Sequence, residues 1–229
     1  MDNNGHADKK RHKMISSSIV RKITMALSGL FLILFLTQHL AINLTSILPD
    51  EGKTFNKIAH FMGYNPIVQF IIQPILIVGV IFHFLMGFII EIKNNKSRSE
   101  KYKFYNQNNS SWFSRNMIFS GLVILSFLVL HFYDFWVPEI DYKYISLNEP
   151  DSLRYYDELI HKFHGDNIKL FLYCISFVFL GFHLYHGFAS SLKSIGFDHK
   201  YYKMIKKICE LYSVIVPAGF ILIAVIHFL

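Results

Sequence analysis

The sequence predicts an all-α transmembrane protein with five membrane-spanning helices, and three observations support this fold class. Of the 229 residues, 52% are hydrophobic and only 17% are charged, whereas an average soluble domain carries roughly 25% charged residues. Five apolar stretches each hold about 20 residues or more, enough at about 1.5 Å per residue to cross a hydrocarbon core of roughly 30 Å. The positive charges gather in alternate connections between these stretches. We therefore treat residues 1–229 as a single integral membrane domain.

The five predicted spans cover residues 23–48, 66–92, 116–137, 167–192 and 208–229. The first span is too long for the core of a signal peptide, and no small-residue cleavage site follows it, so we expect it to be retained. Pro138 is expected to end the third span. Pro74 and Pro217 lie inside the second and fifth spans, where proline bends a helix. The connection 138–166 contains an amphipathic segment, SLRYYDELIHKF, which we predict to be a helix at the membrane surface.

The distribution of Lys and Arg predicts the orientation in the membrane. Of the 23 Lys and Arg residues, 17 lie in the N-terminal segment, between the second and third spans, or between the fourth and fifth. By the positive-inside rule the N-terminus is cytoplasmic and Leu229 is outside. The net charge of +7 therefore follows from topology, and we expect no nucleic-acid partner.

Two pairs of spans look like copies of each other. The first and third spans share the pattern Ser-Gly-x9-His, and the second and fourth share His-x3-Gly-x5-Lys. The residues concerned are Ser28, Gly29 and His39, then Ser120, Gly121 and His131, then His83, Gly87 and Lys93, and finally His183, Gly187 and Lys193. Such a repeat predicts two halves related by an approximate two-fold axis along the membrane normal.

The repeated histidines are predicted to lie at two depths. His39 and His131 fall about 26 and 24 Å from the inner ends of their helices, whereas His83 and His183 each fall about 15 Å from theirs. The first two thus form an outer pair and the second two an inner pair.

Paired histidines at one depth point to metal ligation. Imidazole is expensive in hydrocarbon and needs a partner, and two neutral imidazoles on facing helices are the usual axial ligands of a haem b in a four-helix bundle. We therefore predict two haem b groups within the first four spans, an outer one on His39 and His131 and an inner one on His83 and His183. His186, one turn from His183, is an alternative ligand, but only His183 repeats the pattern of the second span. The plainer interpretation of membrane histidines is a hydrogen bond between helices, and the matched set of four favours ligation.

Other repeated residues suit a bound macrocycle. Glycines remove side chains that would block its approach, and cations at the inner ends are candidates for pairing with the propionates of the inner haem, although topology alone also explains such cations. The glycines are Gly29, Gly87, Gly121 and Gly187, and the cations are Arg21, Arg115, Lys93 and Lys193.

Several motifs together resemble a known family. They are Gln38-His39-Leu40-x-x-Asn43, Phe182-His183-x-x-x-Gly187-Phe188, Ala59-His60-Phe61-Met62-Gly63-x-Asn65-Pro66 and Ser114-Arg115-Asn116. With five spans and histidines in the first four, the chain from about residue 17 resembles the single-chain di-haem cytochrome b membrane anchor of succinate dehydrogenase and quinol:fumarate reductase. The last two motifs are similar to the branch of that family in Bacteroidetes-type bacteria.

This resemblance implies a respiratory complex in the bacterial inner (cytoplasmic) membrane. A flavoprotein with FAD and an iron–sulfur subunit would dock on the cytoplasmic face, and electrons would pass through the inner and then the outer haem to a quinone, expected to be menaquinone. The chain itself contains no FAD or iron–sulfur motif. Some fumarate reductases carry a glutamate two residues before the fourth-span ligand, associated with transmembrane proton transfer. Gly181 stands there in this chain, which puts such a pathway in doubt.

The quinone site needs groups that hydrogen-bond carbonyl oxygens and exchange protons with water near the outer haem. His60, next to a Gly-Tyr-Asn-Pro turn, is the first choice, although a plain helix-end role is open for every candidate. The remaining candidates are Gln38, Asn43, Gln69, Gln73 and Asp134.

Two other functions stay open. The chain could serve another quinone-linked dehydrogenase, such as a formate dehydrogenase or a hydrogenase, as a di-haem cytochrome b. It could also be a transporter whose histidines bind a metal ion or relay protons. The transporter hypothesis predicts carboxylates among the mid-membrane histidines, but Glu91 and Asp134 lie near the ends of their spans. Cys174 and Cys209 are interpreted as packing residues.

Overall fold

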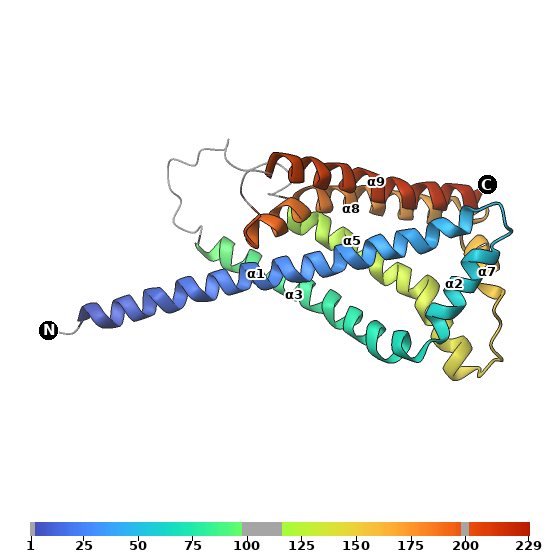
Figure 1. Cartoon of the computed structure of the whole chain (residues 1–229), viewed down its shortest axis with the longest axis horizontal. Helices are drawn as coiled ribbons and strands as arrows, with labels where there is room; N and C mark the ends of the chain where they lie inside the picture. Colours follow the sequence, from blue (N-terminus) through green and yellow to red (C-terminus); the bar gives the residue numbers. More distant parts are fainter. Residues whose placement is uncertain (1–2, 98–115, 198–201) are drawn as a thin grey trace.

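The computed structural model describes residues 3–97, 116–197 and 202–229, and these residues form helices and no strands (Figure 1). The long helices are α1 (Asn3–Leu44), α3 (Gln73–Ser97), α5 (Met117–His131), α8 (Asn167–Ser194) and α9 (Tyr202–Phe228). The shorter α-helices are α2 (Lys53–Tyr64), α6 (Val137–Ile140) and α7 (Arg154–Phe163). A 3₁₀ turn, η1 (Thr45–Ile47), and three π-helical segments, η2 (Val68–Ile72), η4 (Phe132–Trp136) and η5 (Asp141–Ile145), complete the described part.

Five of these helical segments are long and apolar enough to cross a membrane, which confirms the predicted number of spans. They cover Ser18–Ile47, Val68–Asn94, Met117–Ile145, Asn167–Ser194 and Tyr202–Phe228. Large apolar side chains point outward from them, as at Leu34, which is 71% exposed, and Val78, which is 66% exposed. Lipid rather than water suits such a surface, and the chain is a multi-pass membrane protein.

Four of the long helices form a ring, with the fifth outside it. Helix α8 packs against α1 and α5, and α3 packs against α1 and α5 on the other side. Consequently α1 faces α5 across the ring, and α3 faces α8. Helix α9 lies outside, along α8 and α1 (Figure 1). Buried apolar side chains between these helices, among them Leu40, Phe177 and Phe220, form the core.

Gly181 explains how closely α8 and α9 approach each other. A Cβ added at Gly181 would lie 3.0 Å from the backbone oxygen of Ser213 and 3.4 Å from Cγ of Pro217. The position two residues before His183 therefore faces α9, and no side chain fits there without separating the helices.

Helices α2 and α7 cover the end of the molecule that also holds the C-terminus (Figure 1). The amphipathic segment predicted to be helical is α7, which packs against α2 and α9 and buries Leu159 and Phe163 in the core. Helix α2 was not expected from the sequence. It begins after Gly52, whose φ of 74° is in the left-handed region that favours glycine. A Cβ added at Gly52 would clash with the ring of Tyr156, so no other residue fits there.

The prediction that Pro138 ends the third span is wrong, because the helix continues to Ile145. A proline inside an α-helix lacks one hydrogen-bond donor and its ring clashes with the carbonyl four residues earlier. Here the π-helical segment η4 directly precedes α6, and its wider turn relieves that clash, so Pro138 sits in the first turn of α6. Helix α9 also begins six residues earlier than predicted, at Tyr202 rather than at residue 208.

Candidate functional site

The structure brings the repeated histidines together in the two predicted combinations. The ring centres of His83 on α3 and His183 on α8 are 6.3 Å apart, with the ring planes at 70°. The ring centres of His39 on α1 and His131 on α5 are 5.8 Å apart, with the planes at 85°. Each pair joins helices that face each other across the ring, so the imidazoles meet in its interior.

These spacings suit a metal ion between two imidazoles. Two imidazoles bound to opposite sides of one ion, each through a bond of about 2 Å, place their ring centres roughly 6 Å apart. The observed separations of 6.3 and 5.8 Å agree with this value. His183, rather than the alternative His186, is the residue whose ring lies beside His83.

Serine hydroxyls orient both histidines of the inner pair. Ser28 Oγ lies 3.0 Å from Nδ1 of His83 and donates its own hydrogen to the backbone oxygen of Met25 at 2.9 Å. Ser120 Oγ lies 3.2 Å from Nδ1 of His183, and donates to the backbone oxygen of Met117 at 2.9 Å. A hydroxyl has one hydrogen, so both of its contacts are satisfied together only when that hydrogen goes to the carbonyl and Nδ1 donates to the serine oxygen.

This arrangement selects one tautomer of the inner histidines. A neutral imidazole with a hydrogen on Nδ1 keeps its lone pair on Nε2. Nε2 is then the atom available to ligate a metal, while the Nδ1 hydrogen bond fixes the direction of the ring. Both serines belong to the sequence repeat, but the pattern alone does not show what they contact.

The four repeated glycines all lie near the inner pair. A Cβ added at Gly29 would lie 3.4 Å from Cε1 of His83, and one added at Gly121 would lie 3.7 Å from Cε1 of His183. Gly87 and Gly187 instead face methionines, and a Cβ there would lie 3.8 Å from Cε of Met25 and 3.1 Å from Cε of Met117, respectively. The glycines of the first and third spans thus make room for the imidazoles themselves.

Each Ser-Gly-x9-His motif therefore contributes to both histidine pairs. Its serine and glycine contact a histidine of the inner pair on a neighbouring helix, and its histidine belongs to the outer pair. Ten residues separate Gly29 from His39, and also Gly121 from His131, which corresponds to about 15 Å along each helix.

The outer pair is surrounded by aromatic rings instead of serines. Phe35 stacks on His39 with ring centres 5.4 Å apart, and Phe127 stacks on His131 at 5.7 Å, each from four residues earlier on the same helix. Nδ1 of His131 is buried and has no hydrogen-bond partner, and Nδ1 of His39 has only the side-chain nitrogen of Asn43 at 3.5 Å. The two pairs thus repeat in position but differ in their hydrogen bonding.

A buried carboxylate lies one turn beyond His131. Asp134, 4% exposed, accepts a hydrogen bond from the hydroxyl of Tyr173 at 2.7 Å and pairs with the ammonium of Lys169 at 3.4 Å. The ring of Tyr173 in turn lies 6.5 Å from that of His131, centre to centre. The expectation that Asp134 lies near the end of its span is wrong, because the third span continues to Ile145 and places this carboxylate inside the span, close to the outer pair.

The cations proposed for the propionates are spread along the inner ends of the spans. Arg21 is half-buried, and Lys93 and Lys193 are exposed. The ammonium of Lys193 lies 6.0 Å from the ring centre of Tyr202. Arg115 lies outside the described residues.

The quinone candidates fall into several places rather than one. Asn43 donates to the backbone oxygen of its neighbour His39 at 2.8 Å, while Gln38 is exposed. The side chain of Gln69 donates to the backbone oxygen of Gly63, in the covering region of α2. Gln73 opens α3. His60 also lies on α2.

His60 sits in an aromatic and charged cluster at the outer end. Its ring lies 4.6 Å from that of Tyr64 and 6.4 Å from that of Tyr155, centre to centre. Burial raises the pKa of the Tyr155 phenol, and the nearby carboxylate of Glu139 raises it further. Nδ1 of His60 is buried and has no hydrogen-bond partner among the described residues, so it is available to bind a ligand.

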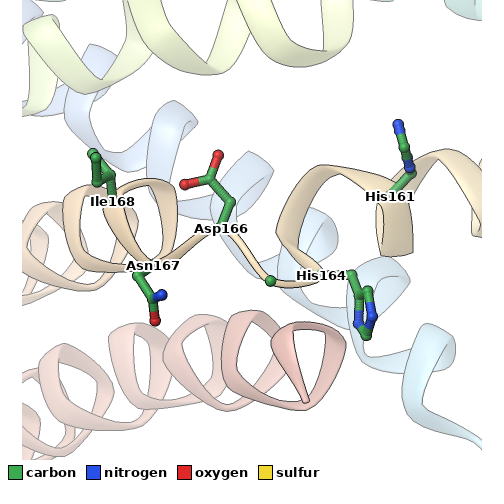
Figure 2. A pocket seen from close by; sticks show the side chains of 6 residues that line it. His161, His164, Asp166, Asn167 and Ile168 are labelled. Atoms are coloured by element: carbon green, nitrogen blue, oxygen red, sulfur yellow. The ribbon is translucent and has the colours of Figure 1, made fainter.

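A hollow of about 520 Å³ at the junction of α7 and α8 is not a metal site. His161, His164 and Asp166 line it, but Figure 2 shows their side chains pointing in different directions. Nowhere in the described ranges do three or more His, Cys, Asp or Glu side chains gather as metal ligands. A haem iron needs only two protein ligands, since the macrocycle supplies the others.

The chain was compared with protein-family models, with curated proteins and with solved structures. None of the three comparisons gives a match, so the function has to be argued from the site itself.

Proposed function

We propose that the chain is the di-haem cytochrome b membrane anchor of a succinate:quinone oxidoreductase. The observation that carries the proposal is the meeting of two histidine pairs, at two levels, across one ring of helices. The separation of each pair suits bis-imidazole ligation, and the serine-bound Nδ1 atoms of the inner pair present Nε2 to a metal. These contacts recur in both halves of the repeat.

In this proposal His83 and His183 hold the inner haem b, and His39 and His131 hold the outer one. Bound haem supplies one-electron transfer without a proton. The chain's own residues position the imidazoles, and the apolar rings of Phe35 and Phe127 keep water from the outer pair. The first four spans would form the di-haem bundle around these ligands.

The proposed partners follow from the sequence motifs and the charge distribution. A flavoprotein with FAD and an iron–sulfur subunit would dock on the cytoplasmic face of a bacterial inner membrane, where most Lys and Arg residues lie. Menaquinone is the proposed electron acceptor or donor. His60 is the residue proposed to hydrogen-bond it, because its buried Nδ1 has no partner in the described part of the chain.

Haem content tests the central claim. We expect a pyridine haemochrome assay on the detergent-purified chain to give two haem b per chain, with a low-spin reduced-minus-oxidised spectrum. His83→Ala and His183→Ala should each remove the same haem, and His39→Ala and His131→Ala the other. His186→Ala is the matched control and should retain both. A folded chain without haem contradicts the proposal and favours the transporter hypothesis.

The electron donor tests the choice among dehydrogenases. In native membranes succinate should reduce the b-type absorbance of this chain, and the chain should co-purify with a flavoprotein and an iron–sulfur subunit. Reduction by formate or hydrogen but not by succinate would instead support the alternative di-haem cytochrome.

A further inference from the structure

Ser28 and Ser120 occupy equivalent places in the two halves of the repeat, and neither contributes a ligand. Both are buried, at 9% and 5% exposure. Each could have satisfied its hydroxyl within its own helix, through the bond to the carbonyl three residues earlier. Each nevertheless also lies within hydrogen-bonding distance of a histidine on another helix.

The direction of these hydrogen bonds has a chemical consequence. All the contacts of the two serines are satisfied together when their hydrogens go to the carbonyl oxygens of Met25 and Met117 and Nδ1 of His83 and of His183 donates to the serine oxygen. An imidazole that donates through Nδ1 has a more basic Nε2 and binds a metal ion more strongly. A more basic ligand favours the more positive, oxidised state of the metal.

The outer pair provides an internal comparison. Nδ1 of His131 has no partner, and Nδ1 of His39 faces an amide nitrogen at 3.5 Å, which is a donor group. No hydroxyl acceptor therefore stands behind either outer imidazole among the contacts described. The same repeat thus supplies the hydrogen-bond acceptor at the inner level only.

We infer that Ser28 and Ser120 are positioning residues that lower the reduction potential of the inner haem selectively, by accepting hydrogen bonds from Nδ1 of its two ligands. This inference rests on the proposed function, since it requires the inner pair to hold a haem. The serines act through the histidines and touch no substrate. The repeat places the two serines in matched positions, but His183 also hydrogen-bonds to the backbone of Met117, so Ser28 is expected to have the larger effect.

The experiment is a spectroscopic redox titration of the purified chain, with the inner haem identified as the one that His83→Ala removes. Ser28→Ala and Ser120→Ala should each raise the midpoint potential of the inner haem and alter its oxidised low-spin spectrum, leaving the outer haem unchanged. The double variant should show a larger shift. Ser28→Thr keeps a hydroxyl and should restore the wild-type potential.

Ser126→Ala is the matched control, because Ser126 lies on α5 as Ser120 does but bonds only to the carbonyl oxygen of Leu122, at 3.1 Å. It should shift neither potential. If the double variant loses the inner haem, the single variants decide the inference, because the potential of the inner haem is then compared between Ser28→Ala and Ser28→Thr. Two retained haems with unshifted potentials would overturn the inference and leave the proposed function standing. A wild-type chain without haem would overturn both.

Discussion

Arg154 on α7 connects this helix to α6 at the outer end of the molecule through its ion pair with Glu139. Its side chain is 7% exposed, yet its guanidinium donates to Glu158 at 2.6 Å and to Glu139, and it stacks over the ring of Tyr155 at 4.4 Å. Burial opposes its charge, but the carboxylates outweigh this effect and raise the pKa of the guanidinium above its ordinary value. The planar guanidinium donates to two different carboxylates through two nitrogens while it stacks on a ring, a combination that the ammonium of lysine cannot reproduce.

Arg154→Ala should therefore destabilise the chain by about 3 kcal/mol, the low end for breaking a buried ion pair, because Lys143 still neutralises Glu139. Thermal unfolding in detergent micelles measures the change. The control is Lys53→Ala, which removes an exposed pair with Glu51 at 3.9 Å and should cost less than about 1 kcal/mol. Equal effects of the two variants would show that the cluster contributes nothing specific.

Tyr155 is expected to make the stability of the folded chain depend on pH. Burial, and then the charge of Glu139, raise the pKa of its phenol, so the folded state favours the neutral form. The stability from this preference is fully present below the ordinary tyrosine pKa of about 10 and is lost as the pH rises through the folded-state value. An ultraviolet titration of phenolate should show that Tyr155→Phe has one late-titrating tyrosine fewer than the wild-type chain. Its ionisation near pH 10 in the folded chain would contradict this expectation.

At the scale of the element, packing between helices decides several features that local patterns miss. The histidines that the repeat pairs do lie close to each other, because the 3.6-residue period places each histidine on a definite helix face. Pro138 was misjudged because its effect depends on the π-helical turn before it, which no local rule specifies. Helix α2 was not predicted because it is short and packs against α7, a contact that the local sequence does not reveal.

The close contact between α8 and α9 is expected to be sensitive to a larger side chain at Gly181. Gly181→Leu should force the helices apart and destabilise the chain by about 1–3 kcal/mol, because the added side chain meets the backbone oxygen of Ser213. Ala218→Leu, at an exposed position of α9, adds similar apolar volume toward lipid and is expected to be nearly neutral. Comparing the unfolding temperatures of the two variants tests the prediction. A neutral Gly181→Leu would mean that α9 is free to shift along α8.

For the whole molecule, the orientation in the membrane is the property most open to direct measurement. Lys53 opens α2 near the C-terminal end of the structure, whereas Lys206 lies in the first turns of α9, at the opposite end. Lys53→Cys in intact cells should react with a membrane-impermeant maleimide. Lys206→Cys should react only after the membrane is permeabilised. The reverse pattern would contradict the positive-inside assignment and would place the proposed partner subunits on the other face.

The sequence by itself determined the number of spans, the internal repeat and the combinations in which the four histidines meet. These depend on hydropathy and on helical periodicity, which are local properties of the chain. Only the tertiary structure decided that Ser28 and Ser120 bond to the inner histidines, that Gly29 and Gly121 make room for imidazoles, and that Arg154 links the covering helices. Such contacts join residues far apart in the chain, and their partners are set by how helices pack and not by the spacing of residues along any one of them.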